Sequence, residues 1–319
     1  MSVATCLLLY SFVVAVLGPP LLVRLAHSGV APRLGVTAWI AALASVTLSW
    51  AGAAVFVGVE LARMGTRPGR ELLDSCFASL REIVTGRAGV VLQAGLLMLS
   101  AAAILVLFLV IGRVCRRMLS MRSHTHGHAR MTRIVGRRIA GIDAIVLNAP
   151  QRAAYCVAGR PNAIVVTSAA LDALDRRQLD AVLAHERAHL SGRHLQLLAL
   201  IRGLAASLPR MALFTTAETE VARLLEMCAD DSAARTHGSR TVLTGLLALS
   251  GGPLPTDALG ATGVAVLDRA QRLAAPSPPT DRARVRALLT ATTTLITAGP
   301  LVTALLAVSG VMLCGPMAL

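Results

Sequence analysis

Long apolar stretches without a charged residue dominate the hydrophobic pattern of this chain. Crossing a bilayer takes about 20 consecutive apolar residues, and four uncharged stretches reach that length: residues 1–23, 34–59, 88–112 and 287–319. We therefore predict transmembrane helices at about 3–23, 35–59 and 89–112 and a fourth within 287–319, which Gly299-Pro300 would kink or tilt. The first stretch lacks the basic start and the cleavage site of a signal peptide, so we expect a retained helix.

The segment between the third and fourth stretches has a different pattern. Runs rich in β-branched residues at 143–148, 153–158 and 163–168 predict strands. The Gly-Arg-Pro-Asn turn at 159–162 predicts a hairpin between the last two runs. Residues 113–140, which precede these runs, are basic and are expected to form an irregular linker.

Helical periodicity follows the hairpin. Asp175 and Gln178 have the spacing of a capping box, which predicts that a helix begins near Arg176. Pro209 should break the chain after that helix. Thr215 and Glu218 form a second capping pair, so we expect another helix there that runs through "EVARLLEMCADDSAAR".

Composition favours an integral membrane protein. Hydrophobic residues make up 55% of the chain and charged residues only 15%, which excludes a chain built only as a soluble domain. All basic residues are arginines; Arg24 and Arg33 flank the first connection, and eight arginines follow the third stretch before Asp143. Because cytoplasmic loops are rich in basic residues, we expect a bacterial cell-membrane protein with both termini outside and residues 113–286 in the cytoplasm.

The net charge of +14 raises the question of nucleic-acid binding. The arginines gather beside the apolar stretches, where they attract anionic lipid and fix topology. Aromatic residues make up only 3% of the chain, and it has no signature of an RNA-binding or helix-turn-helix module. We therefore expect contact with the lipid bilayer and no direct nucleic-acid binding.

A histidine tract and the cysteines are the next candidates for metal binding. His124, His126 and His128 form a short tract that can bind metal, although a solvated linker is the interpretation that we favour. The six cysteines lie far apart and form no Cys-x-x-Cys pair. We therefore expect neither a disulfide framework nor a cysteine zinc site.

The stretch "AHERAHLSGRH" at residues 184–194 contains the strongest chemical signal. In a helix, His185 and His189 are separated by about 40° around the axis, so both imidazoles face one metal ion. Glu186 lies about 100° from His185, where it can contact a water bound to the metal without being a ligand. This pattern is typical of a zinc site that activates water, with Glu186 as the catalytic base.

A catalytic zinc site needs a third protein ligand, and two candidates compete. His194 lies one residue short of the metzincin position, and a continuing helix would turn it about 180° away from His185; only a sharp turn at Gly192 could bring it back. Glu226 lies on the second predicted helix, four residues before Asp230. We favour Glu226 as the ligand, with Asp230 accepting a hydrogen bond from the other ring nitrogen of a histidine. His237 is a weak candidate for the oxyanion donor.

The set His185, Glu186, His189, Glu226 and Asp230 resembles the gluzincin arrangement of HtpX-type and CAAX prenyl proteases and of the BlaR/MecR membrane metallopeptidases. HtpX-type enzymes have two spans on each side of the zinc motif. The three predicted spans before the motif and one after it resemble the BlaR/MecR peptidase module. That family often carries Asp where this sequence has His194. No penicillin-binding domain follows the fourth span, so direct β-lactam acylation is not expected.

The resemblance implies a mainly α, integral membrane fold. Three transmembrane helices (1–112) would come first and a fourth (287–319) last. A cytoplasmic α+β gluzincin-like zinc protease domain (113–286) would be inserted between the third helix and the fourth. It implies one Zn²⁺ per chain and cleavage of a cytosolic protein, such as a BlaI-type transcriptional repressor, together with possible self-cleavage. The strand "AIVVTS" or its hairpin partner would be the edge to which substrate adds. The alternatives are an HtpX-like quality-control protease and a non-catalytic zinc-containing receptor or scaffold.

Overall fold

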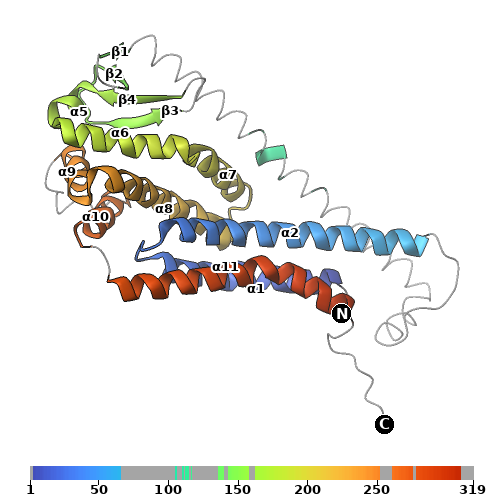
Figure 1. The fold of residues 1–319 in the computed structure, drawn as a ribbon. Coiled ribbons are helices and arrows are strands. Elements are labelled where there is room, and N and C mark those ends of the chain that lie inside the picture. The colour runs from blue at the N-terminus through green and yellow to red at the C-terminus, as the bar shows by residue number, and fades with distance from the viewer. Residues whose placement is uncertain are drawn as a thin grey trace. The chain divides into compact units, whose positions relative to one another are not determined.

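The computed structural model describes residues 3–65, 105, 110, 112–114, 116, 136–139, 143–157, 162–251, 261–275 and 278–309. The chain divides into two compact units, whose helices and strands are labelled in Figure 1. The first unit holds residues 1–20, 40–113 and 291–319. The second unit holds residues 21–39 and 114–290 and contains the zinc motif.

Three helices are long and apolar enough to cross a membrane among the residues that the structure describes. They are α1 (Val3–Ala26), α2 (Pro32–Gly65) and α11 (Pro279–Val308). These helices cover the spans predicted at 3–23 and 35–59 and the described part of the fourth stretch. The span predicted at 89–112 lies almost entirely outside the described residues. Helix α11 begins at Pro279, eight residues before its predicted start, because proline is well suited to the first position of a helix.

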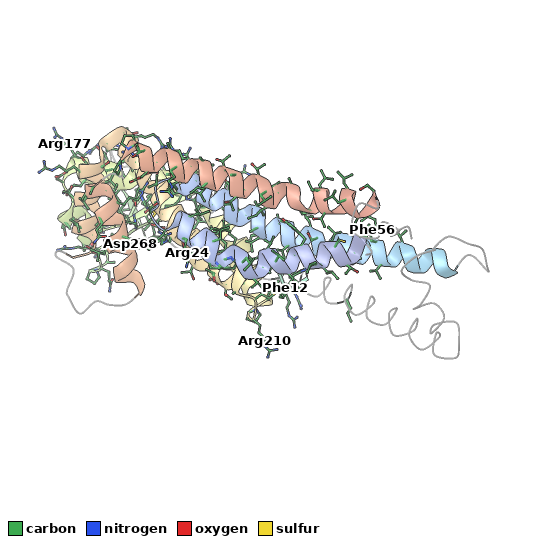
Figure 2. The ribbon with its side chains drawn as sticks, turned by 90° about the horizontal axis from the view of Figure 1, so that it is seen from below. Phe12, Arg24, Phe56, Arg177, Arg210 and Asp268 are labelled. Atoms are coloured by element: carbon green, nitrogen blue, oxygen red, sulfur yellow. The ribbon has the colours of Figure 1, made fainter. Side chains whose placement is uncertain are left out.

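Several large apolar side chains on these helices are exposed. Phe12 on α1 and Phe56 on α2, both labelled in Figure 2, are 65% and 37% exposed. Leu295 and Leu301 on α11 are also exposed. Exposed apolar surface of this kind marks contact with lipid or protein. The three apolar helices therefore indicate membrane association, whereas the predicted orientation stays a prediction.

Pro300 lies inside α11, and the first unit compensates for the hydrogen bond that it removes. Proline has no N–H, so the carbonyl of Ile296, four residues earlier, loses its helical donor. Tyr10 Oη donates to that carbonyl at 2.7 Å and Ser45 Oγ donates at 3.0 Å. A Cβ at Gly299 would lie 2.3 Å from the Tyr10 ring, so the neighbouring glycine permits this approach. The helix continues past Pro300 to Val308.

The second unit contains a four-stranded sheet in the order β1-β2-β4-β3. Strands β3 (Ala154–Val157) and β4 (Ala163–Thr167) form the predicted antiparallel hairpin, in which Cys156 pairs with Ile164. Strand β2 (Ile145–Leu147) runs parallel to β4. Strand β1 (Arg137–Arg138) pairs with β2. The predicted irregular linker is therefore wrong at 137–138, where two residues gain backbone partners without any local strand signal.

Helices cover this sheet and build the core. Short helix α5 (Ser168–Ala173) follows β4, and α6 (Arg176–Ser191) begins with the predicted capping box, in which Asp175 and Gln178 each accept a hydrogen bond from the other's backbone N–H. Helix α6 and strand β4 share an apolar cluster of buried residues that includes Ile164, Val166, Leu179 and Leu183. The capping box thus fixes the start of the helix that carries the zinc motif.

The remaining helices of the unit are α7 (His194–Ser207), α8 (Ala212–His237), α9 (Ser239–Leu249) and α10 (Ala261–Ala274). The predicted capping pair at the start of α8 is wrong. The cap is Met211, without a side-chain hydrogen bond, and Thr215 Oγ1 instead bonds the carbonyl oxygens of Met211 and Ala212 within the first turn. Burial of Leu213 and Phe214, both fully inaccessible, extends the helix toward its N-terminus.

The connection between α1 and α2 packs on α8 within the second unit. Arg223 donates hydrogen bonds to the carbonyl oxygens of Ala26 and His27 at 3.1 Å each, which satisfies free carbonyls at the end of α1. Gly29 has a positive φ of 60°, and a Cβ there would lie 2.4 Å from Sδ of Met227. Glycine is therefore required where this connection crosses the helix that carries Glu226.

Candidate metal centre

Three side chains of metal-ligand type converge between α6 and α8. His185 and His189 lie one turn apart on α6, and Glu226 extends from α8. One ligand atom of each lies within 4.8 Å of the other two. The Nε2 atoms of the two histidines are 3.1 Å apart. Carboxylate oxygens of Glu226 lie 3.5 Å from Nε2 of His185 and 3.4 Å from Nε2 of His189.

These separations fit a tetrahedral zinc site. With zinc–ligand bonds of about 2.0–2.1 Å, ligand atoms of a tetrahedral site lie roughly 3.3 Å from one another. The two Nε2 atoms, 3.1 Å apart, have about that spacing. Each oxygen of Glu226 is near one histidine, since Oε2 lies 3.5 Å from His185 and Oε1 lies 3.4 Å from His189, so a carboxylate oxygen faces each imidazole. Two histidines and one glutamate leave a fourth position for water or substrate, as in catalytic zinc sites. The Glu226 side chain is 42% exposed, so that position can be reached from solvent.

Asp230 holds His185 from behind. Nδ1 of His185 lies 3.1 Å from Oδ1 of Asp230, and a carboxylate can only accept, so His185 donates. This hydrogen bond fixes the tautomer that leaves Nε2 of His185 free to bind metal. Asp230 is completely buried. A buried carboxylate must be compensated by a positive partner or by hydrogen-bond donors.

Arg269 on α10 supplies that compensation. Its Nε and Nη2 atoms donate to the two oxygens of Asp230 at 2.8 and 2.7 Å. Its Nη1 atom lies 3.1 Å from Oε2 of Glu226. One guanidinium therefore touches both the carboxylate that orients His185 and the carboxylate that faces the two histidines. The planar donor fork of arginine is suited to such bidentate contacts.

His194 orients the second histidine. A sharp turn after α6 places Arg193 at a positive φ of 52° and brings His194 back toward the centre, where its Nδ1 lies 3.0 Å from Nδ1 of His189. When Nε2 of His189 binds metal, its Nδ1 carries the proton and donates, so His194 accepts. A Cβ at residue 192 would lie 2.4 Å from the His194 ring, so Gly192 makes room for this contact.

Glu186 lies between the metal group and strand β3. The side chain is 8% exposed. Burial raises its pKa to about 7, against the opposing effects of His185 and of hydrogen bonds from the thiol and backbone N–H of Cys156. Burial and the adjacent Glu186 raise the pKa of the Cys156 thiol to about 12, so the thiol stays protonated. Glu186 is thus a carboxylate that can gain and lose a proton near neutral pH.

In the metal-free centre at neutral pH, His185 is protonated and His189 is neutral. Burial lowers the pKa of His185, but hydrogen bonds to Asp230 and Glu226 outweigh it and raise the pKa to about 9. Burial lowers the pKa of His189 to about 4. Burial would raise the pKa of Glu226, but the hydrogen bond from His185 and the charge of Arg269 lower it to about 2. His185 must therefore lose a proton when a metal ion binds.

The structure separates the residues that the sequence singled out. It brings His185, Glu186, His189, Glu226 and Asp230 together and puts His194 behind His189 rather than among the ligand atoms. His237 ends α8, 11 residues after Glu226, which places it roughly 16 Å along the helix axis from that residue. His237 therefore lies far from the metal group. The tract His124, His126 and His128 lies outside the described residues.

Two contacting residues are absent from the sequence-based prediction. Arg269 lies 39 residues beyond Asp230, and one arginine among the 31 in the chain carries no signal of its own. Cys156 lies in a predicted strand, and the sequence does not show which residue a strand side chain will contact. Only the hairpin signal around Cys156 could have drawn attention to it.

Comparison with known proteins bears on the same region. The family model described as Peptidase family M48 matches residues 125–247. The search of curated proteins and the search of solved structures gave no match. The matched segment includes the sheet, the zinc motif, Glu226 and Asp230, and it ends before Arg269. Peptidases of the M48 family use zinc, which the His185, His189 and Glu226 cluster could bind. The match of residues 125–247 to Peptidase family M48 implies metalloprotease activity and supports a zinc metallopeptidase of the membrane type.

Proposed function

We propose that this protein is a membrane-embedded zinc endopeptidase that hydrolyses peptide bonds of a cytosolic protein. The observation that carries the proposal is the convergence of the ligand atoms of His185, His189 and Glu226, with the buried Glu186 beside them. Zinc held by these three side chains would supply a Lewis acid for the substrate carbonyl and would lower the pKa of a water molecule to about 7. The match to Peptidase family M48 supports the same reaction class.

Each side chain of the centre has a separate task in this reaction. Glu186 takes a proton from the attacking water and delivers it to the leaving nitrogen, as its pKa near 7 permits. Asp230 and His194 hold the rings of His185 and His189 in the orientation that binding requires. Arg269 keeps the buried Asp230 charged and pairs with the more exposed Glu226.

Strand β3 is the element to which substrate would add. It is an edge strand in the part of the sheet that the structure describes, and Cys156 in that strand hydrogen-bonds with Glu186. A peptide that pairs with this edge lies extended, with its backbone fixed by hydrogen bonds. The edge location favours β3 over β4, because β4 is an interior strand between β2 and β3.

For the substrate, we propose a BlaI-type transcriptional repressor, and self-cleavage of the chain is a further expected product of the same activity. Support comes from the order of elements, since apolar helices α1 and α2 precede the zinc motif and α11 follows it, with a further apolar stretch at 88–112 in the sequence. This order resembles the BlaR/MecR peptidase module. The proposed topology places the protease domain on the cytoplasmic side, where a repressor is located.

A single substitution tests the enzymatic proposal. Glu186→Gln in the full chain should retain zinc and lose about 10²- to 10⁴-fold in hydrolysis of casein and of a co-expressed repressor. Glu218→Gln, an equal change at a half-exposed position on α8 that pairs with Arg202, should leave both readouts unchanged. Hydrolysis that persists in Glu186→Gln at full zinc content would show that this centre is not the peptidase, and would favour a zinc-containing receptor or scaffold.

The same assay separates signalling from quality control. A repressor-specific protease should cut the folded repressor at one bond and leave denatured membrane proteins intact. An HtpX-like quality-control enzyme should cut denatured membrane proteins at many bonds and spare the folded repressor. Mass spectrometry of the products distinguishes the two patterns directly.

A further inference from the structure

A second polar site lies in the same unit as the metal centre and shares none of the ligand residues. It is a cavity of about 210 Å³ whose lining includes three arginines (Arg272, Arg282 and Arg286), one acid (Asp231) and two serines (Ser28 and Ser239). The arginines outnumber the single carboxylate. The cavity is therefore positively charged, and its hydroxyl groups can donate hydrogen bonds to an anion.

Its walls come from five segments of the second unit, and Asp231 is the contribution of α8. Ser28 belongs to the connection between α1 and α2, Arg272 to α10, and Ser239 is the first residue of α9. Arg282 and Arg286 lie one turn apart on α11, so both face the same side of that helix. Helix α9 begins without a side-chain cap, so its first backbone N–H groups add positive potential at the cavity.

Arg272 and Arg286 differ in their partners within the part of the chain that the structure describes. Arg272 donates to the carbonyl oxygen of Gly29 at 2.8 Å and forms a close ion pair with Asp231. Arg286 makes no ion pair with any residue that the structure describes, and it is exposed. An anion that enters the cavity would meet this arginine directly. Its neighbour Arg282 is partly buried on the same helix face.

Size and location indicate the chemistry of that anion. A water molecule takes about 30 Å³, so the cavity has room for a phosphate group and the atoms next to it. Arg282 and Arg286 directly precede the apolar part of α11, and Ser28 lies between the apolar helices α1 and α2. Basic cavities at the ends of membrane helices are suited to the headgroups of anionic lipids.

We propose that this cavity binds a phosphate group, presented by an anionic phospholipid of the surrounding bilayer. Arg286 and Arg282 bind the phosphate oxygens, and Ser239 with the start of α9 also donates to them. The site is independent of peptide hydrolysis, so its test does not require protease activity.

The test uses the full chain in a neutral detergent and native mass spectrometry with added phosphatidylglycerol or phosphatidylcholine. The wild type should retain one phosphatidylglycerol and bind phosphatidylcholine more weakly. Arg282→Gln/Arg286→Gln should lower phosphatidylglycerol affinity about 30-fold, since each arginine near an anionic lipid contributes a factor of about 5. Arg210→Gln/Arg284→Gln removes the same charge from exposed positions outside the cavity and should have no such effect. Equal zinc content in all variants shows that each is folded.

A parallel titration with inorganic phosphate alone identifies the source of the group. Thermal stabilisation by phosphate that the cavity variant loses, without a preference for phosphatidylglycerol, supports a phosphate site that takes the free ion. Equal loss of binding in the two double variants would mean that the effect is general charge attraction and would overturn the proposal. Undiminished binding in the cavity variant would overturn it as well.

Discussion

Arg269 donates two hydrogen bonds to the carboxylate of Asp230, at 2.8 and 2.7 Å. It lies on α10, which follows the zinc motif, Glu226 and Asp230 in the sequence. This ion pair links α10 to the helix that carries Glu226. It also explains how a carboxylate with no solvent exposure stays charged beside His185. The metal centre therefore depends on three helices, α6, α8 and α10.

Removal of the Arg269 charge should destabilise the domain and weaken its metal site. Arg269→Gln leaves the buried Asp230 without its positive partner, which typically costs about 3–5 kcal/mol. Zinc affinity should fall about 10- to 100-fold, because the support of a ligand is lost. Denaturant unfolding and competition with a zinc chelator measure the two effects. Arg187→Gln, which removes an exposed pair with Asp143, should cost less than about 1 kcal/mol; an equal loss there would contradict the role of Arg269.

Zinc affinity should rise with pH up to about 9. The metal-free protein carries a proton on His185, whose pKa is about 9, and zinc must displace it. From about pH 7, the pKa of Glu186, up to pH 9, each unit should raise the apparent affinity about tenfold, because His185 releases one proton per zinc bound. Above pH 9 the affinity should level off. Chelator competition between pH 6.5 and 9.5 measures the slope.

The same titration with Asp230→Asn provides the control for the proton assignment. Loss of the hydrogen bond to Asp230 lowers the pKa of His185, so the rise in affinity should end at a lower pH than in the wild type. An unchanged slope up to pH 9 in this variant would show that the released proton comes from another group.

Cys156 should tune the acid side of the activity profile. Its thiol helps to lower the pKa of Glu186, so Cys156→Ala should raise that pKa. Because Glu186 must be deprotonated to act as a base, activity of the variant should require a higher pH than activity of the wild type. In the zinc-loaded enzyme the wild-type midpoint should lie at or below about 7, since a cation stabilises the carboxylate. Cys228→Ala, a buried cysteine of α8, should leave the midpoint unchanged.

His194 should act through its contact with His189. His194→Ala removes the acceptor for Nδ1 of His189 and should lower zinc affinity about 10- to 100-fold. His194→Asp provides a carboxylate acceptor and should restore most of the loss. His237→Ala changes a histidine at the far end of α8 and should have no effect. Equal affinity in His194→Ala and the wild type would mean that the contact does not support the ligand.

The first unit offers a test of the proline in α11. Tyr10→Phe/Ser45→Ala removes both donors to the carbonyl of Ile296. It should lower the free energy of unfolding in detergent by about 1–2 kcal/mol. Adding Pro300→Ala supplies a backbone N–H for the same carbonyl and should recover part of the loss. A triple variant no more stable than the double variant would contradict this account.

Local signals in the sequence predicted local features well. The capping pair of Asp175 and Gln178, the turn at 159–162 and the helical spacing of His185 and His189 each involve residues within four positions of one another. The start of α8 was predicted wrongly for the same reason, since Thr215 and Glu218 have the spacing of a cap while burial of Leu213 and Phe214 favours an earlier start.

Long-range contacts could be predicted only where chemistry narrowed the choice. After Glu186 the chain contains three glutamates, so Glu226 with Asp230 could be singled out as the partner of a distant histidine pair. Arg269 had no such advantage, because arginine is the commonest charged residue in this chain. The position of His194 depended on the backbone at Arg193, whose left-handed conformation has no clear marker in a non-glycine residue.

The late position of Arg269 along the chain has a consequence for biosynthesis. Ribosomes add about 5–20 residues each second, so Arg269 is synthesised roughly 2–8 s after Asp230, from which it is 39 residues away. During that interval a nascent chain contains every metal ligand and the catalytic glutamate but lacks the arginine that holds two of the carboxylates. Full assembly of a peptide-cutting centre is thereby delayed until almost all of its own domain has left the ribosome.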